Sequence, residues 1–318
     1  MSTALLPQEA KKAEEVYKDI QSFKGLPANE IMPAMKHMSA ALGVKCGFCH
    51  DEQNWAAPNE HKTESRKMIE MQNKINADFF NNRPEVSCSS CHNGRGKPNA
   101  IPNVGDLVLR HKRPTTRSKP EEMFAPYLKA IGTVGSMTLT GATTGEFAQK
   151  VELKVSGDKF VLTLDEMKLG FDGTVTWHSE AGKTDILTGA DAVHVRHMGR
   201  LHLTQATFDT WSNKGDVGTE TVAGAECKVL RGALNTERIS EEAYFDATSG
   251  LLRRMSAITP SVVGRVATYV DFEDYRSVGG AKVPHKLTFN EGGNIMVVQF
   301  DSAKATKLED STFAPPKG

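Results

Sequence analysis

The spacing of apolar residues changes from a helical period to a strand period near residue 123. Before that point, apolar positions recur every three or four residues in three segments. This spacing predicts amphipathic helices over about residues 7–23, 31–42 and 63–80. Gly43 follows the second segment and is expected to end that helix, while Thr63 is expected to cap the third.

Beyond residue 123 the apolar positions alternate. Residues 150–164 place apolar side chains at every second position on both sides of a Ser-Gly-Asp turn. Further turns are expected at 172–173, near Gly250 and at 279–280. The pattern predicts an antiparallel meander of many strands, with a helix around residues 202–213 lying against it.

The change of pattern predicts an α+β chain of two domains, and 318 residues are enough for both. We expect an α-helical dihaem cytochrome c domain over residues 1–97. A linker rich in proline, glycine and basic residues would occupy 98–122, and a β-rich barrel or half-barrel 123–318. Four cations of the linker could meet haem propionates or an acidic partner, although such a run is more typical of a solvated tether: Arg110, Lys112, Arg113 and Arg117.

Composition excludes several classes of partner. Acidic and basic residues balance at 39 each and aromatic residues are 7% of the chain, so nothing indicates nucleic acid or a membrane surface. No apolar run approaches the roughly 20 residues of a spanning helix. The first residues turn polar at once, so we expect that this chain carries no export signal.

The cysteines carry the clearest chemistry. Four of the five lie in two Cys-x-x-Cys-His segments, Cys46, Cys49 and His50 in the first and Cys88, Cys91 and His92 in the second. At this spacing both cysteines can form thioethers with one haem, and the adjacent histidine can bind its iron. The sequence therefore predicts two covalently attached haem c groups, with His50 and His92 as proximal ligands.

Other readings of the cysteines and histidines fit less well. A zinc site would need no histidine after each pair, and a redox dithiol should begin a helix in a βαβ unit, which the pattern lacks. The fifth cysteine, Cys227, is expected to be a buried unpaired thiol. Three histidines in residues 194–202 could suggest a metal site, but their expected strand setting favours surface and strand histidines.

The sixth ligand of each iron is not determined by spacing alone. Five methionines lie near the motifs, and at least three of them must be packing residues: Met32, Met35, Met38, Met68 and Met71. The nitrogen alternatives are His37, His61 and His111.

A family resemblance narrows this choice. The stretch MKHMSAALGVKCGFCH, the helix after it and VSCSSCHNG resemble the haem-binding repeat of the tetrahaem cytochrome subunit of purple-bacterial photosynthetic reaction centres, and its small dihaem relatives. The resemblance covers about residues 30–95. It implies Met35 and Met68 as distal ligands and leaves Met38 and Met71 in the core.

The chain also departs from that family. It has one pair of motifs where the tetrahaem subunit has two, and no lipid-attachment cysteine near its start. Asn82 stands where one family haem would take a second histidine, so two His/Met haems are expected.

Short hairpins of the second region resemble another group. FDGTVTWH and AYFDATSGLLRRM are similar to lipoprotein-carrier and sorting-protein half-barrels of the bacterial envelope. This resemblance implies a concave apolar surface that could hold a lipid, a quinone or a partner segment, although small barrels more often have a filled core.

These features together predict electron transfer. A thioether ligand stabilises ferrous iron, and two strong axial ligands close the iron to oxygen and peroxide. We expect a non-enzymatic carrier of single electrons in the periplasm or outside the cell, which meets redox partner proteins and could self-assemble or dock on a membrane complex. The alternatives are a dihaem peroxidase and a ligand-binding or sensor protein that uses a pocket of the β domain.

Overall fold

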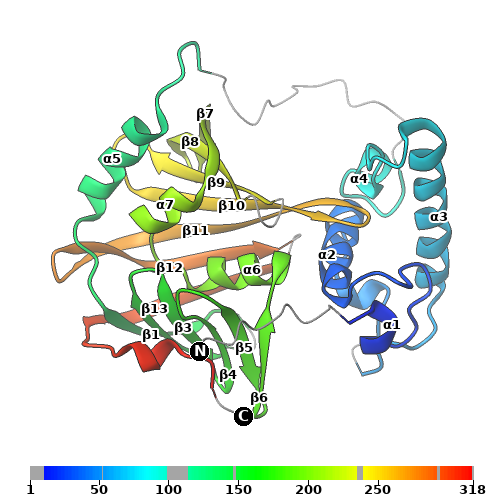
Figure 1. Cartoon of the computed structure of the whole chain (residues 1–318), viewed down its shortest axis with the longest axis horizontal. Helices are drawn as coiled ribbons and strands as arrows, with labels where there is room; N and C mark the ends of the chain where they lie inside the picture. The colour runs from blue at the N-terminus through cyan, green and yellow to red at the C-terminus, as the bar shows by residue number, and fades with distance from the viewer. Residues whose placement is uncertain are drawn as a thin grey trace, which may run out of the picture. The chain divides into compact units, whose positions relative to one another are not determined.

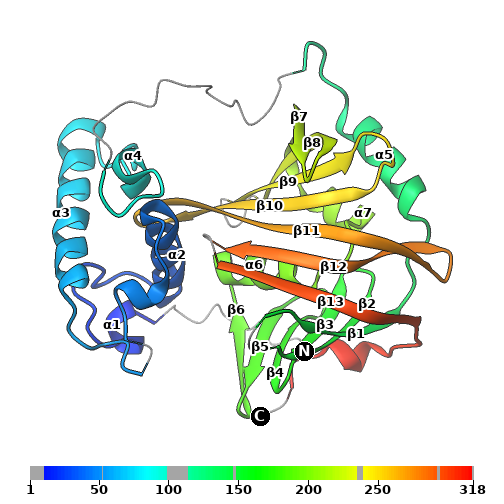
Figure 2. The same ribbon diagram turned by 180° about the vertical axis from the view of Figure 1, so that it is seen from behind.

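The chain divides by its internal contacts into two units. The computed structural model describes residues 11–51, 53–98, 114–145, 148–234, 239–291 and 294–316. The first unit comprises Met1–Asn103 together with Pro260–Val266, and the second comprises Val104–Thr259 and Ala267–Gly318. Both are drawn in Figure 1 and, from behind, in Figure 2. Among the described residues, no helix has both the length and the apolar character needed to cross a membrane.

Short and long helices make up the described part of the first unit. They are α1 (Ala13–Val16), η1 (Ala28–Glu30), α2 (Ile31–Leu42), η2 (Cys46–Phe48), α3 (Glu60–Phe80) and α4 (Cys88–His92). Helix α2 has the predicted bounds and ends at Gly43, whose φ of +66° is left-handed. Helix α3 begins three residues before the predicted start, because Asn59 rather than Thr63 caps it: its Oδ1 accepts from the amide of His61 at 2.8 Å.

The core of the first unit includes a residue from far along the chain. Phe23, Ile31, Ala34 and Ile69 are buried in one cluster with Val263, which is fully buried. Ala13 of α1 is buried in the same cluster. The segment Pro260–Val266 therefore supplies part of the apolar core that covers α2 and α3.

The expected helix over residues 7–23 is wrong. Only α1 forms there, and residues 7–10 lie outside the described part. Tyr17 is extended and Asp19 has a left-handed φ of +61°, which a continuing helix cannot accommodate. The Asp19 carboxylate instead bonds Arg66 at 2.8 Å, so a tertiary contact replaces the local helix.

An open antiparallel sheet dominates the second unit, as predicted. Its thirteen described strands follow the order β6-β5-β4-β3-β2-β1-β13-β12-β11-β10-β9-β8-β7. The strands are β1 (Met137–Thr143), β2 (Lys150–Ser156), β3 (Lys159–Leu164), β4 (Met167–Phe171), β5 (Thr176–Glu180), β6 (Lys183–Leu187), β7 (Ser212–Val222), β8 (Ala225–Leu234), β9 (Ile239–Asp246), β10 (Leu252–Ser261), β11 (Gly264–Val278), β12 (Ala281–Glu291) and β13 (Asn294–Ala305).

The predicted turns join neighbouring strands. Ser156 pairs with Lys159 across the first turn, and Gly157 there has a φ of +60°. The turns at 172–173, near Gly250 and at 279–280 likewise connect β4 to β5, β9 to β10 and β11 to β12. The alternation of apolar residues thus predicted these hairpins correctly, because strands such as β2 bury every second side chain.

Helices cover one face of the sheet, the face toward the viewer in Figure 1 and away in Figure 2. They are α5 (Pro120–Ile131), α6 (Gly189–Gly199) and α7 (Gln205–Thr210), and the short turn η3 (Asp310–Phe313) lies near the C-terminus. Phe124 of α5 stacks on Phe208 of α7 with ring centroids 4.4 Å apart, and both are buried in the main core. Much of the apolar face of the sheet is therefore filled by the chain itself.

Two of these helices differ from expectation. Helix α5 crosses the expected boundary at 122–123: Glu122 accepts from the amide of Lys119 at 3.3 Å, and a helical stripe that includes Phe124 and Tyr127 is buried. Helix α6 contains His194 and His197, which were expected in a strand. Its first residue, Gly189, has a left-handed φ of +58°. The expected helix at 202–213 is the shorter α7. The domain limits at 97 and 122 remain predictions.

Candidate haem-binding sites

Both Cys-x-x-Cys-His segments fold into a single helical turn. In the first, the amide of His50 donates to the carbonyl of Cys46 at 3.0 Å, and in the second α4 runs from Cys88 to His92. Residues three and four apart lie on one side of such a turn. Each segment therefore presents two cysteines and a histidine on the same side, with one cysteine of each pair exposed and the other half-buried.

The two proximal histidines are oriented in the same way. Nδ1 of His50 lies 3.1 Å from the carbonyl oxygen of Trp55, and Nδ1 of His92 lies 2.9 Å from the carbonyl oxygen of Arg95. A carbonyl can only accept, so each Nδ1 carries the proton and each Nε2 keeps its lone pair. Histidines that bind metals usually donate their other ring N–H in this manner. The geometry fits iron ligation through Nε2 in both segments.

Buried polar side chains of α3 hold the surrounding loops. Lys62 Nζ donates to the carbonyls of Trp55 and Ala57 at 2.7 and 2.8 Å. Asn76 bonds both backbone groups of Val86 at 2.8 and 2.9 Å, just before the second motif. These side chains position the two segments, and hydrophobic periodicity missed them because they are polar. Their helical spacing, together with Ile69, was the available signal.

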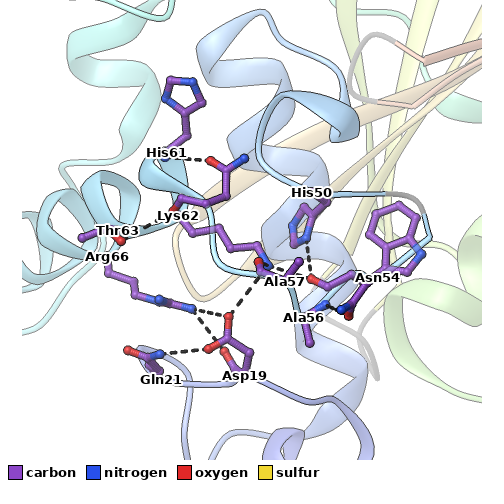
Figure 3. Close-up of polar contacts among 12 residues, drawn as sticks. Asp19, Gln21, His50, Asn54, Ala56, Ala57, His61, Lys62, Thr63 and Arg66 are labelled. Carbon is purple, nitrogen blue, oxygen red and sulfur yellow. Dashed lines mark hydrogen bonds and ion pairs between the residues drawn. The ribbon is translucent and has the colours of Figure 1, made fainter.

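Figure 3 shows the ion cluster beside the first segment. The carboxylate of Asp19 lies 2.8 Å from Arg66 and 3.7 Å from Lys62, so two cations face one anion. Burial alone would raise the pKa of Asp19, but hydrogen bonds from Gln21 and Arg66 hold it below its usual value. The carboxylate is therefore ionised at neutral pH.

The half-buried cysteines differ from ordinary surface thiols. Burial raises the pKa of Cys49, against the opposing effect of Lys62, and burial raises the pKa of Cys88. Cys88 Sγ also donates to Oε1 of Gln72 at 3.4 Å, which ties α4 to α3. Both thiols are thus harder to deprotonate than an exposed thiol.

The predicted distal methionines lie in different surroundings. Met35 of α2 is partly buried against the first-unit core, whereas Met68 of α3 is 41% exposed. The expected apolar face of α3 is not the face buried by the protein: Met71 and Phe79 are 47% and 75% exposed. Met38 packs against the core as expected, but the assignment of Met71 to the core is wrong. The buried face of α3 instead carries Ile69, and it adjoins the exposed face around the helix.

The nitrogen alternatives are placed as follows. His37 is buried in α2, where a Cβ built on Gly264 would come within 2.4 Å of its ring. The ring of His61 stacks on Phe48, which lies between the cysteines of the first motif, with centroids 4.0 Å apart. His111 and the linker cations Arg110, Lys112 and Arg113 lie outside the described residues, while Arg117 is exposed.

The competing metal sites do not form in the described part of the chain, which contains no group of three or more His, Cys, Asp or Glu side chains suited to a metal ion. His197 instead pairs with Glu241 at 2.6 Å, and His194 pairs with Glu291. Cys227 is buried and unpaired as predicted, and burial raises the pKa of its thiol to about 11.

A binding pocket in the second unit is less evident. A shallow hollow among the described residues, lined by Val134, Met137, Leu201, His202, Lys282, Val283 and Pro284, has an empty volume of about 160 Å³, part of which is open to solvent. Ligand binding by this unit therefore stays a prediction from resemblance.

Comparisons with known proteins support the cytochrome resemblance. Residues 2–123 match the family model described as photosynthetic reaction centre cytochrome C subunit. The photosynthetic reaction center cytochrome c subunit of Thermochromatium tepidum is 34% identical over 158 residues, which cover 43% of this chain and 39% of that protein. Cytochrome c-554 of Chloroflexus aurantiacus is 32% identical over 103 residues, 30% of this chain and 24% of that protein. The chain thus matches well under half the length of these relatives.

The chain also has neighbours among solved structures. A crystal structure of a LolA superfamily protein from Nitrosomonas europaea covers 62% of this chain and 98% of its own, with a TM-score of 0.45 and 11% identity. The N-terminal resemblance to the reaction-centre cytochrome subunit is confirmed by the family match and by both relatives.

Proposed function

We propose that this protein is a dihaem c-type cytochrome that carries single electrons in the cell envelope. Its first unit would hold two haem c groups, one attached to Cys46 and Cys49 and the other to Cys88 and Cys91. The matching family model and both relatives are cytochromes, which supports the class. The number of haems and their ligands are our inference from this chain's own residues.

The observation that carries the proposal is the matched setting of His50 and His92. Each donates its Nδ1 proton to a backbone carbonyl a few residues ahead, so both present Nε2 from a turn that also presents two cysteines. A redox dithiol would not need an oriented histidine, and a four-cysteine zinc site would leave both histidines without a role. Two independent segments with one geometry favour two equivalent cofactors.

Each group of residues has a distinct part. The cysteines would anchor the cofactor, the histidines would donate from Nε2, and Met35 and Met68 would supply a sixth ligand to the first and second iron. Haem c, when attached, supplies a one-electron iron couple. The exposed apolar stripe of Met68, Met71 and Phe79 on α3 fits the covering of an apolar macrocycle.

The compartment and partners follow from this class. Thioether attachment of haem implies maturation outside the cytoplasm, so we place the protein in the periplasm or at the cell surface. Redox partner proteins, and self-assembly or docking on a membrane complex, are the interactions we propose for it. A closed six-coordinate iron would make it a carrier rather than an enzyme.

A potentiometric titration of the haem spectrum, on protein matured with its haems, tests the proposal. It is repeated with carbon monoxide and with peroxide, and the haem content is measured by mass. We expect two haems that cycle reversibly and ignore both reagents. An iron that binds carbon monoxide or is consumed by peroxide would instead indicate the peroxidase or sensor alternative, and a mass without two haems would overturn the dihaem assignment.

A further inference from the structure

The carbonyl of Trp55 accepts two hydrogen bonds at once. His50 Nδ1 lies 3.1 Å from its oxygen, and Lys62 Nζ lies 2.7 Å from the same oxygen. The proximal histidine of the first segment is therefore linked, through one backbone atom, to a side-chain ammonium. No motif or periodicity in the sequence indicated this link.

Lys62 is held in this position by its surroundings. Its side chain is 9% exposed, and a second bond to the carbonyl of Ala57 at 2.8 Å fixes the ammonium on the loop. Asp19 approaches to 3.7 Å, but Arg66 lies closer to the carboxylate at 2.8 Å. Asp19 therefore balances only part of the positive charge.

The second segment has a different setting. His92 donates to the carbonyl of Arg95 at 2.9 Å, in a turn whose residues 93–97 are all exposed. Residues 53–55 of the first turn are also exposed, so what sets the first segment apart is the largely buried ammonium that bonds the Trp55 carbonyl. The two histidines thus share an orientation but have unequal acceptors.

An unequal acceptor changes the donor strength of a histidine ligand. A strong acceptor at Nδ1–H gives the ring more anionic character, which stabilises ferric iron, and hydrogen bonding around a ligand is one means of setting a haem potential. Two donors on one oxygen each draw electron density from it, so each bond is weaker than it would be alone, and the nearby ammonium also disfavours ferric charge. Both effects act in the same direction at His50.

We propose that Lys62 is a positioning residue that raises the reduction potential of the first haem by competing with His50 for the Trp55 carbonyl. The inference rests on the proposed dihaem function and deepens it, because it makes the two haems unequal and gives electron flow between them a direction. The first haem would be the stronger oxidant of the pair for otherwise equal surroundings.

Lys62→Met keeps the length of the side chain and removes its charge and donors. We expect the ferrous-to-ferric ratio of the first haem at fixed ambient potential to fall about tenfold, equal to about 59 mV for a one-electron couple. The second haem should not change. In the reduced protein, the NMR signal of His50 Nδ1–H should move downfield, since its hydrogen bond becomes stronger. Lys67→Met, on the exposed side of the same helix, is the control for charge and should move neither haem.

Asp19→Asn provides an opposite test. Without the carboxylate, the Lys62 ammonium is no longer attracted to Asp19 and bonds the Trp55 carbonyl more strongly. The reduction potential of the first haem should therefore rise. A merely structural role of the cluster would shift the potential the same way in both variants. Opposite shifts confined to the first haem support the proposal, and shifts of one sign, or none, overturn it. If the Lys62 proposal fails but each variant still shows two reversible waves, the dihaem function is retained. If the parent protein lacks two haems, both the Lys62 proposal and the dihaem function are overturned.

Discussion

Gly43 and Gly94 meet so closely that a Cβ on Gly43 would lie 2.2 Å from the carbonyl oxygen of Gly94. The amide of Gly94 donates to the carbonyl of Ala41 at 2.8 Å. Gly43 ends α2 just before the first motif, and Gly94 follows the second motif by two residues. The backbone itself thus joins the two cysteine-bearing segments, without any side chain at the point of contact.

Gly43→Ala should disturb this junction. The left-handed backbone costs about 1–2 kcal/mol for any residue with a Cβ, and the clash with Gly94 adds to that cost. Gly25→Ala is the matched control, because Gly25 also has a positive φ of +80° but nothing within 4 Å of a Cβ. Urea unfolding followed by the haem absorbance should show a larger loss for Gly43→Ala. Equal losses of unfolding free energy in the two variants would mean that the contact between Gly43 and Gly94 adjusts to a Cβ without cost.

Met68→Ala should open the second haem alone. Loss of the thioether frees a coordination position, so this iron should bind carbon monoxide in about equal amount to the protein, and its potential should fall by at least about 60 mV. Met71→Ala, on the same exposed stripe, should do neither. An unchanged spectrum and potential in Met68→Ala would refute the assignment of this ligand.

Glu241→Gln should destabilise the second unit. The carboxylate is almost fully buried, 2.6 Å from both His197 and Trp211, and breaking a buried pair costs about 3–5 kcal/mol. Hydrogen exchange of the β9 amides should report this loss, with exposed Glu226→Gln as the control. Burial opposes ionisation, yet Arg200 and His197 hold the pKa of Glu241 at about 2.

That depressed pKa also sets the pH dependence of the Glu241 effect. The stabilisation is complete above the unfolded value near 4.5 and is lost as the pH falls through about 2. The difference between parent and Glu241→Gln should therefore shrink in that range. A constant difference down to about pH 2 would contradict the ionised state of Glu241.

His202 should make the second unit acid-sensitive. Burial lowers its pKa to about 4 from 6.5, and its Nδ1 has no hydrogen-bond partner among the described residues. Above about pH 6.5, His202 is neutral in both the folded and the unfolded protein. Between about pH 6.5 and 4, only the unfolded chain gains a proton on this residue. Stability should fall by about 3 kcal/mol across that range. Urea unfolding followed by circular dichroism of the sheet should show a smaller pH effect in His202→Leu, and an equal effect would assign the sensitivity elsewhere.

Local patterns predicted the elements whose stability is local. Helix α2 with its Gly43 cap and the hairpins of the sheet follow from periodicity and turn residues, since neighbouring residues determine both. The predicted helix over residues 7–23 does not form, because Asp19 leaves the helical conformation and bonds Arg66, 47 positions away. The sequence did not predict helix α6, because its apolar residues lie on several sides of the helix and the resulting pattern resembles a buried strand.

Some residues of the candidate sites could be predicted from the sequence and others could not. The cysteines and proximal histidines stand in a contiguous motif, so the sequence was enough to propose them. Lys62, Gln72 and Asn76 are buried polar residues whose partners are backbone or thiol groups of other segments, and a hydropathy pattern assigns such residues to the solvent-facing side. The family resemblance placed Met71 in the core, but the protein leaves this side chain exposed. Helical spacing shows that a face exists but not whether protein or cofactor covers it.

The return of residues 260–266 to the first unit affects how the protein can be made. Ala13 and Val263 share one cluster, so the core of the cysteine-bearing unit is incomplete until most of the chain has been synthesised. In the proposed cytochrome, the cysteines would then stand on a loosely packed segment until residues 260–266 have been synthesised. A fragment ending at residue 98 would keep both motifs but leave Ile31, Ala34 and Ile69 without Val263, and should age and aggregate faster than the whole chain.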